Sequence, residues 1–136
     1  MFTPLKEHGA EKGGLHVGIM GFGGLGQMGI LLAKAMGNHV SVISRNDKKI
    51  ALAKELGADN FIAQNDEEGM KKNAYTLDLI IDTIPVGHDI NPPLSLVKKK
   101  GVYVVVGAAL EPFQVKKSFN KTKVTLVHDC MQQYAD

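Results

Sequence analysis

The stretch GIMGFGGLGQMG, from Gly18 to Gly29, contains six glycines and the pattern G-x-G-x-x-G. In a strand-to-helix turn these glycines have separate roles: Gly21 allows the tight turn, Gly23 lets the backbone approach a pyrophosphate, and Gly26 permits close packing of helix on strand. The free N–H groups and partial positive charge at the start of the helix attract phosphates. The stretch therefore predicts a pyrophosphate site. A plain turn whose glycines serve packing alone is the alternative.

A second group of polar residues follows the next apolar run, about 20 residues after the glycines. A site for NAD places an aspartate or glutamate there to accept a hydrogen bond from the ribose 2′-OH. Ser44 and Arg45 stand at this place instead, with Lys48 and Lys49 close behind. These side chains would bind a 2′-phosphate that a carboxylate would repel. The sequence thus favours NADP(H) over NAD(H), with a solvated helix start as the alternative for the basic residues.

The elements that would position these residues alternate in type along the chain. Short apolar, β-branched runs are separated by helix-like segments, which is typical of a parallel sheet with crossover helices. The expected fold class is α/β, a doubly wound parallel sheet of about six strands in which ligands bind outside the carboxyl ends of the strands. We expect strands at Leu15–Gly21, His39–Ser44, Asn60–Ala63, Leu77–Ile84, Val102–Gly107 and Lys123–His128.

Three helices are expected between these strands. The first runs from Gly24 to Met36, with Leu25, Met28, Leu32 and Met36 on one face. The second, KKIALAKEL, ends at Gly57 and would be capped by Asn46 or Asp47.

The third expected helix is NPPLSLVKKKG, from Asn91 to Gly101. Its prolines would lie in the first turn, and Lys98, Lys99 and Lys100 at its C-terminus. An acidic loop should precede the fourth strand. Asp78 and Asp82 flank that strand, and we expect them to accept hydrogen bonds from neighbours rather than to act as acids.

Length, charge and cysteine content limit the class of protein. The 136 residues fit one domain, 1–136, and a net charge of +2 is too small to indicate a nucleic-acid partner. The single cysteine, Cys130, excludes a disulfide framework and suits a reducing compartment. No apolar run is long enough to cross a membrane. These features favour a soluble cytoplasmic protein.

Several motifs together resemble the nucleotide-binding domain of zinc-dependent medium-chain alcohol dehydrogenases, of the cinnamyl alcohol dehydrogenase type. They are GFGGLGQMGILLAKAMGNHVSVISRNDKK, LAKELGAD and LDLIIDTIPVGHDINPPLSLVKKKGVYVVVG, and the resemblance covers about Thr3 to Phe113. It implies a Rossmann dinucleotide-binding fold and NADP(H) as cofactor. It places the pyrophosphate at Gly21, Gly23, Gly24, Leu25 and Gly26. It places the 2′-phosphate at Ser44, Arg45 and Lys49. It places the ribose and nicotinamide at Thr83, Pro85, Gly107 and Ala108.

The resemblance also implies parts that this sequence does not carry. The family holds its zinc with two cysteines and a histidine or carboxylate on a separate catalytic domain, whereas this chain has one cysteine. We therefore assign no catalytic or metal-binding residue here and expect an isolated or truncated cofactor domain, with zinc only in the absent catalytic domain. His128, Asp129 and Cys130 depart from the family's glycine-containing segment near the nicotinamide. The resemblance further implies a homodimer formed through the sixth strand.

Two other functions remain open from the sequence. One is a stand-alone nucleotide-sensing or dimerisation module without catalysis. The other is an S-adenosylmethionine-dependent methyltransferase, whose first turn is similarly rich in glycine. A methyltransferase would need an acidic residue at the end of the second strand, where Ser44 and Arg45 stand.

Overall fold

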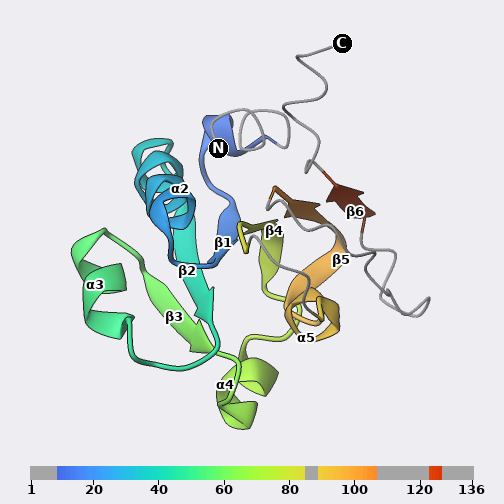
Figure 1. The fold of residues 1–136 in the computed structure, drawn as a ribbon. Coiled ribbons are helices and arrows are strands. Elements are labelled where there is room, and N and C mark those ends of the chain that lie inside the picture. The colour runs from blue at the N-terminus through green and yellow to red at the C-terminus, as the bar shows by residue number, and fades with distance from the viewer. Residues whose placement is uncertain (1–8, 85–88, 107–122, 127–136) are drawn as a thin grey trace.

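Six parallel strands form one sheet in the computed structural model, which describes residues 9–84, 89–106 and 123–126. Their order across the sheet is β3-β2-β1-β4-β5-β6 (Figure 1). This order reverses direction between β1 and β4, as in a doubly wound sheet, so the predicted fold class is confirmed. The strands are β1 (His16–Met20), β2 (His39–Ser44), β3 (Asn60–Ala63), β4 (Leu77–Asp82), β5 (Val97–Val105) and β6 (Lys123–Leu126).

Helices cover both faces of the sheet. One buried cluster joins β1, β2 and β4 to α2 and α3, and the other joins β4 and β5 to α5, with Met70 of α4 packed against it. Figure 1 shows α2 and α3 apart from α4 and α5. Within the described ranges, none of the helices combines the length and apolar character needed to cross a membrane. The helices are η1 (Ala10–Lys12), α2 (Gly24–Ala35), α3 (Ile50–Glu55), α4 (Glu67–Lys72) and α5 (Asn91–Leu94).

Helix α2 rests on the sheet through three small residues and Ile30, which corrects the face predicted for it. Its buried residues are Gly26, Gly29, Ile30 and Ala33. Leu32 and Met36 are half-buried against the core, as expected, but the side chains of Leu25, Met28 and Leu31 are 43–51% exposed. Because the helix lies close to the strands, only small side chains fit beneath much of it, and the large ones that flank them turn outward.

The predicted helix from Asn91 to Gly101 is wrong beyond its first turn. Helix α5 ends at Leu94, and the chain enters β5 at Val97, so the three lysines lie on a strand. The carbonyl oxygen of Leu96 accepts hydrogen bonds from the N–H groups of Thr76 (3.0 Å) and Leu77 (2.9 Å), and Val97 pairs with Leu77. Pairing with β4 and burial of Val97 therefore override the helical signals of the prolines and lysines.

The acidic segment after β3 forms a helix instead of the expected loop. Glu67 and Glu68 lie in the first turn of α4 and Lys71 and Lys72 in its last. This arrangement places each charge at the helix end whose dipole stabilises it. None of the residues of α4 is buried, which explains why its sequence shows no apolar period.

Asp59 ties α2 to the edge of the sheet. Its carboxylate accepts hydrogen bonds from Lys34 Nζ (2.9 Å to Oδ2) and from the Val40 N–H (2.9 Å). Burial raises the pKa of the Asp59 carboxyl, but the bond from Val40 and the bond and charge of Lys34 outweigh burial, and its pKa lies below the ordinary value. The folded state thus favours ionised Asp59.

Replacing Asp59 with asparagine should lower the free energy of unfolding at pH 7 by about 0.5 kcal/mol, because a solvent-screened ion pair is lost. A depressed pKa stabilises the fold above the unfolded value near 3.9 and loses that effect as pH falls through the folded pKa. The difference between Asp59→Asn and the unsubstituted chain should therefore disappear as pH falls from about 4 through the lowered pKa of the folded state. Urea unfolding across this range measures it. A difference that grows as pH falls would contradict this account.

Candidate dinucleotide site

Three predicted site segments come together at the carboxyl edge of the sheet. Met20, the last residue of β1, pairs with Ile43 of β2 on one side and with Asp82 of β4 on the other. The next residues, Gly21, Ser44 and Thr83, therefore leave three neighbouring strands at the same level. Ligands of doubly wound sheets bind at this edge, beside the point where strand order reverses.

Gly21 and Gly26 are required by the geometry of the turn itself. Gly21 has φ +98°, and a Cβ built on it would lie 2.5 Å from Thr83 Oγ1. A Cβ on Gly26 would collide with the backbone carbonyl of Gly21. The hydroxyl and the N–H of Thr83 each donate to the Met20 carbonyl oxygen at 2.8 Å. Thr83 thus joins β4 to the start of the turn, and the turn leaves no room for side chains on its inner side.

Gly23 and Gly24 have the opposite surroundings. Apart from adjacent residues and the backbone of α2 itself, no atom of the described structure lies within 4 Å of a Cβ built on either of them. Gly23 precedes the first turn of α2, where no side chain caps the helix and no acidic residue is present. The first N–H groups of an α-helix have no acceptor within the helix. The turn therefore presents open backbone, N–H donors and the positive end of the helix dipole, beside the half-exposed Leu25.

The basic segment begins where β2 ends. Ser44 is half-buried, and Arg45, Lys48 and Lys49 are exposed. Among the residues that the structure describes, none pairs with Arg45, Lys48 or Lys49 in a salt bridge. Three exposed cationic side chains and one exposed carboxylate, Asp47, therefore give this segment next to the glycine turn a net positive charge, which favours an anion.

The backbone of this segment is held by its neighbours. Gln64 donates its N–H to the Ser44 carbonyl oxygen (2.8 Å), and Asn65 donates to that of Arg45 (3.2 Å). Asn46 Oδ1 accepts the N–H of Lys48 at 3.1 Å. The expected capping of α3 by Asn46 or Asp47 is wrong, because Lys49 occupies the N-cap and no side-chain bond caps the helix. Asn46 shapes the loop instead.

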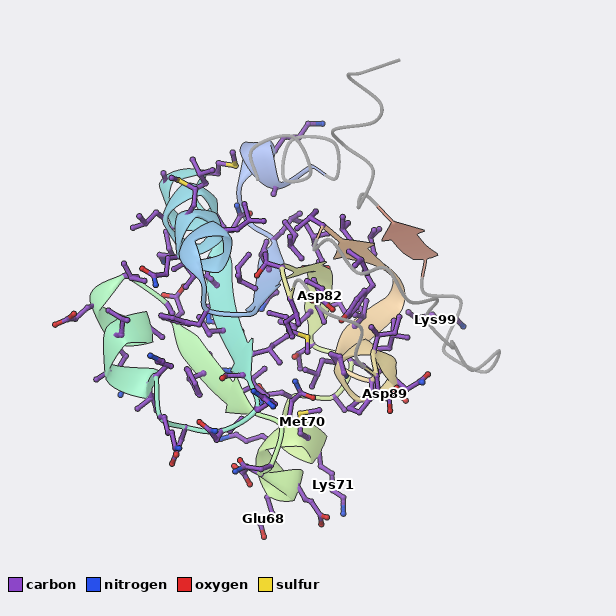
Figure 2. All side chains as sticks on the ribbon, in the orientation of Figure 1. Glu68, Met70, Lys71, Asp82, Asp89 and Lys99 are labelled. Carbon is purple, nitrogen blue, oxygen red and sulfur yellow. The ribbon has the colours of Figure 1, made fainter. Side chains whose placement is uncertain are left out.

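A buried polar pair lies beneath the exit of β4. Tyr103 of β5 is fully buried, and its hydroxyl donates to Asp82 Oδ2 at 2.6 Å. Asp82 Oδ1 accepts the N–H of Ile84 at 3.0 Å, and Figure 2 shows Asp82 inside the molecule. Burial, followed by the Asp82 charge, raises the pKa of the Tyr103 phenol well above its ordinary value.

Sequence reasoning expected Asp82 to accept hydrogen bonds, and this is confirmed. The same holds for Asp78, which accepts the His16 N–H (2.9 Å) and pairs with Lys98 (3.3 Å). The role of Tyr103 was missed. In the sequence, Tyr103 stands out only as a single tyrosine within an aliphatic strand. Its contact with Asp82 cannot be inferred until the pairing of β4 with β5 is known.

Nine of the twelve predicted cofactor residues lie at this edge. Pro85, Gly107 and Ala108 fall outside the described residues, as do His128, Asp129 and Cys130. Within the described ranges, no three histidine, cysteine, aspartate or glutamate side chains come together in a way that could hold a metal ion. The described residues do not fit a zinc site, and we assign no zinc chemistry to them.

Comparisons with known proteins agree with the class that the fold and the glycine turn define, a dinucleotide-binding domain. The family model described as "Zinc-binding dehydrogenase" matches residues 24–135. The chain therefore belongs to the zinc-binding dehydrogenase family. This membership gives no support to the methyltransferase alternative.

Relatives and solved structures point to one part of this family. A "Probable cinnamyl alcohol dehydrogenase" of Populus deltoides is 49% identical over 115 residues, which are 84% of this chain and 32% of that protein. A cinnamyl alcohol dehydrogenase of Sorghum bicolor superposes with a TM-score of 0.84 at 38% identity, over 98% of this chain and 41% of that one.

A third similar protein was solved with a cofactor. The enzyme CAD from Helicobacter pylori, crystallised as a complex with NADP(H), has a TM-score of 0.76 and 34% identity, over 92% of this chain and 36% of its own. The chain spans about a third of the length of the curated relatives that it matches.

The surroundings of the glycines predict that two similar substitutions have different effects on stability. Gly26→Ala should lower the free energy of unfolding by about 2 kcal/mol, because the new methyl group must displace the Gly21 carbonyl. Gly23→Ala should change it by less than about 0.5 kcal/mol, since the methyl group enters open space and φ is −77°. Denaturant unfolding of both variants measures these effects. Equal losses would contradict the roles given to the two glycines.

Proposed function

We propose that this chain binds NADP(H) as a single Rossmann dinucleotide-binding domain spanning residues 1–136. The observation that carries the proposal is the pairing of two features at one edge of the sheet. The turn at Gly23 and Gly24 offers open backbone for a pyrophosphate, and the exit of β2 beside it carries Ser44 and Arg45, where a site for NAD has a carboxylate, followed by Lys49. The complex of the Helicobacter pylori relative with NADP(H) supports the same cofactor.

Each residue has a distinct part in this proposal. The backbone of Gly21, Gly23, Gly24, Leu25 and Gly26 would hold the pyrophosphate, because the N–H groups and dipole of α2 favour anions. Ser44, Arg45 and Lys49 would bind the 2′-phosphate through hydroxyl, guanidinium and ammonium groups. For the ribose and nicotinamide we propose Thr83, Pro85, Gly107 and Ala108.

Only part of the Thr83 side chain is available to contact a bound cofactor. Its hydroxyl proton is engaged with the Met20 carbonyl, and the residue is 8% exposed. An oxygen lone pair and the methyl group are what remain for a ligand. Thr83 therefore acts mainly by holding the turn in place.

For the whole protein we propose hydride transfer between an alcohol or aldehyde and the nicotinamide, in the cytoplasm. The bound cofactor supplies the hydride chemistry. The residues of this chain bind and orient the cofactor, while zinc and the proton-transferring groups belong to a separate catalytic domain. The similarity to cinnamyl alcohol dehydrogenases supports this activity.

Removing the guanidinium of Arg45 should abolish the preference for NADPH over NADH. In the unsubstituted chain we expect NADPH to bind more tightly and to raise the melting temperature more than NADH does. Arg45→Ala should weaken NADPH binding roughly 10- to 100-fold, the range of a charge-assisted hydrogen bond to phosphate, and leave NADH binding nearly unchanged. Calorimetric titration and thermal melting with both cofactors measure this.

Lys54→Ala is the matched control, because it removes one positive charge from the last turn of the same helix that follows the site. It should leave the preference for NADPH intact. If NADH binds the unsubstituted chain as well as NADPH does, the assignment of the 2′-phosphate is wrong. If neither cofactor binds, the proposed function itself fails.

We also propose a homodimer formed through β6. This strand stands at the end of the strand order and pairs only with β5 among the described strands. An edge strand presents unpaired N–H and C=O groups that a second copy can satisfy across a two-fold axis. Sedimentation equilibrium should therefore give twice the chain mass of 14.7 kDa. A single-chain mass at micromolar concentration and above would contradict the dimer.

A further inference from the structure

We propose that the Tyr103 hydroxyl, acting through Asp82, is a positioning group that holds the glycine turn in its pyrophosphate-binding geometry. The inference rests on the proposed binding of NADP(H) and adds to it a residue one strand away from the turn. Tyr103 lies in β5, whereas the turn follows β1, and β4 separates the two strands.

The first step is the contact between β5 and β4. Tyr103 pairs with Ile80, so its side chain leans along β4 for two residues to reach Asp82. The hydroxyl lies 2.6 Å from Asp82 Oδ2 and 3.5 Å from the sulfur of Met20. Both polar side chains lie in an otherwise apolar cluster. A carboxylate in such surroundings must be hydrogen-bonded, so its position is tightly determined by its donors.

The second step leads from Asp82 to the exit of β4. Asp82 Oδ1 accepts the N–H of Ile84 at 3.0 Å, two residues further along the chain. This bond bends the backbone around Thr83, which lies between the two residues. It therefore determines where the Thr83 side chain is placed.

The third step leads from Thr83 to the turn. Its N–H and hydroxyl both donate to the Met20 carbonyl at 2.8 Å, and Thr83 Oγ1 lies against the space beside Gly21 and Gly26. A shift of Thr83 would either displace the backbone of this turn or remove the contacts that hold it in place. Orientation of N–H donors toward a phosphate is sensitive to displacements of about 1 Å. The Tyr103 hydroxyl thus affects the geometry of the cofactor site through Asp82 and Thr83, without contacting the cofactor.

Tyr103→Phe tests this by removing one oxygen atom and no apolar volume. We expect the NADPH dissociation constant to rise roughly tenfold at a temperature where the variant is fully folded, the scale of one hydrogen bond to a charged group. In the cofactor-free protein, amide hydrogen exchange should become faster at Gly21 and Gln27, whose N–H groups bond to Ile43 and Gly23, relative to Val40. A residue that only stabilises the fold would not alter this ratio.

Thr76→Val is the matched control. The Thr76 hydroxyl donates to the Asn73 carbonyl at 2.6 Å just before β4 begins, at the opposite edge of the sheet. Its loss should destabilise the protein without changing NADPH affinity or the exchange ratio. If Tyr103→Phe leaves NADPH affinity unchanged, as Thr76→Val does, the inference is overturned. If the unsubstituted chain does not bind NADPH, the proposed function fails and the inference with it.

A second pair of variants covers the case in which Tyr103→Phe does not fold. Asp82→Asn keeps an oxygen that accepts the Ile84 N–H, and its amide nitrogen can donate to the Tyr103 hydroxyl oxygen, which reverses the direction of that bond, whereas Asp82→Ala keeps neither contact. The asparagine variant should bind NADPH several-fold more tightly than the alanine variant. Equal affinities would show that these hydrogen bonds do not position the turn.

Discussion

The contact between Gly26 and the backbone carbonyl of Gly21 is the constraint on which the rest of the structure depends. Helix α2 can begin directly above β1 only because neither residue carries a side chain on the inner side of the turn. This close approach places the first turn of α2, with its free N–H groups, at the carboxyl edge of the sheet. It also explains why three of the four buried residues of α2 are small, while Leu25, Met28 and Leu31 are exposed.

The same constraint connects distant parts of the chain. The space that Gly21 leaves open is taken by Thr83, which closes the gap between β1 and β4 with two bonds to Met20. Asp82 and Tyr103 support that closure from within the core. On the other side of β1, the backbone carbonyls of Ser44 and Arg45 accept hydrogen bonds from Gln64 and Asn65, which follow β3. A rigid turn and a held basic loop thus flank the place where strand order reverses.

Much of this arrangement could be predicted from the sequence. The bounds of β2 and β3 match the expectation, because apolar runs between clear turn signals leave few other choices. The doubly wound parallel sheet followed from the alternation of strands and helices. Local spacing also placed the residues from Gly21 to Gly26 and from Ser44 to Lys49 at the carboxyl edge of the sheet, while their binding roles stay a prediction.

The errors arose where distant contacts decide local structure. The segment from Val97 to Gly101 has the lysines and the final glycine typical of a helix C-terminus. It nevertheless forms a strand, because it pairs with β4. Helix α4 has its charges at the favourable ends but has no buried residue. Its sequence therefore lacks the periodic spacing of apolar residues that predicts a helix. The exposure of Met28 depends on how closely α2 approaches the sheet. Tyr103 became recognisable only when its strand was placed beside Asp82.

We propose that the glycine turn and the basic loop together bind a dinucleotide with a 2′-phosphate. Titration of NADPH and NADH followed by amide NMR shifts tests it most directly. NADPH should shift the amides of Gly23, Gly24 and Arg45 with one saturation curve and leave those of His16 and His39, at the opposite edge, unmoved. NADH, which lacks the 2′-phosphate, should shift the glycines but should shift Arg45 much less than NADPH does. Equal shifts of Arg45 by both cofactors, or shifts confined to the opposite edge, would contradict the claim.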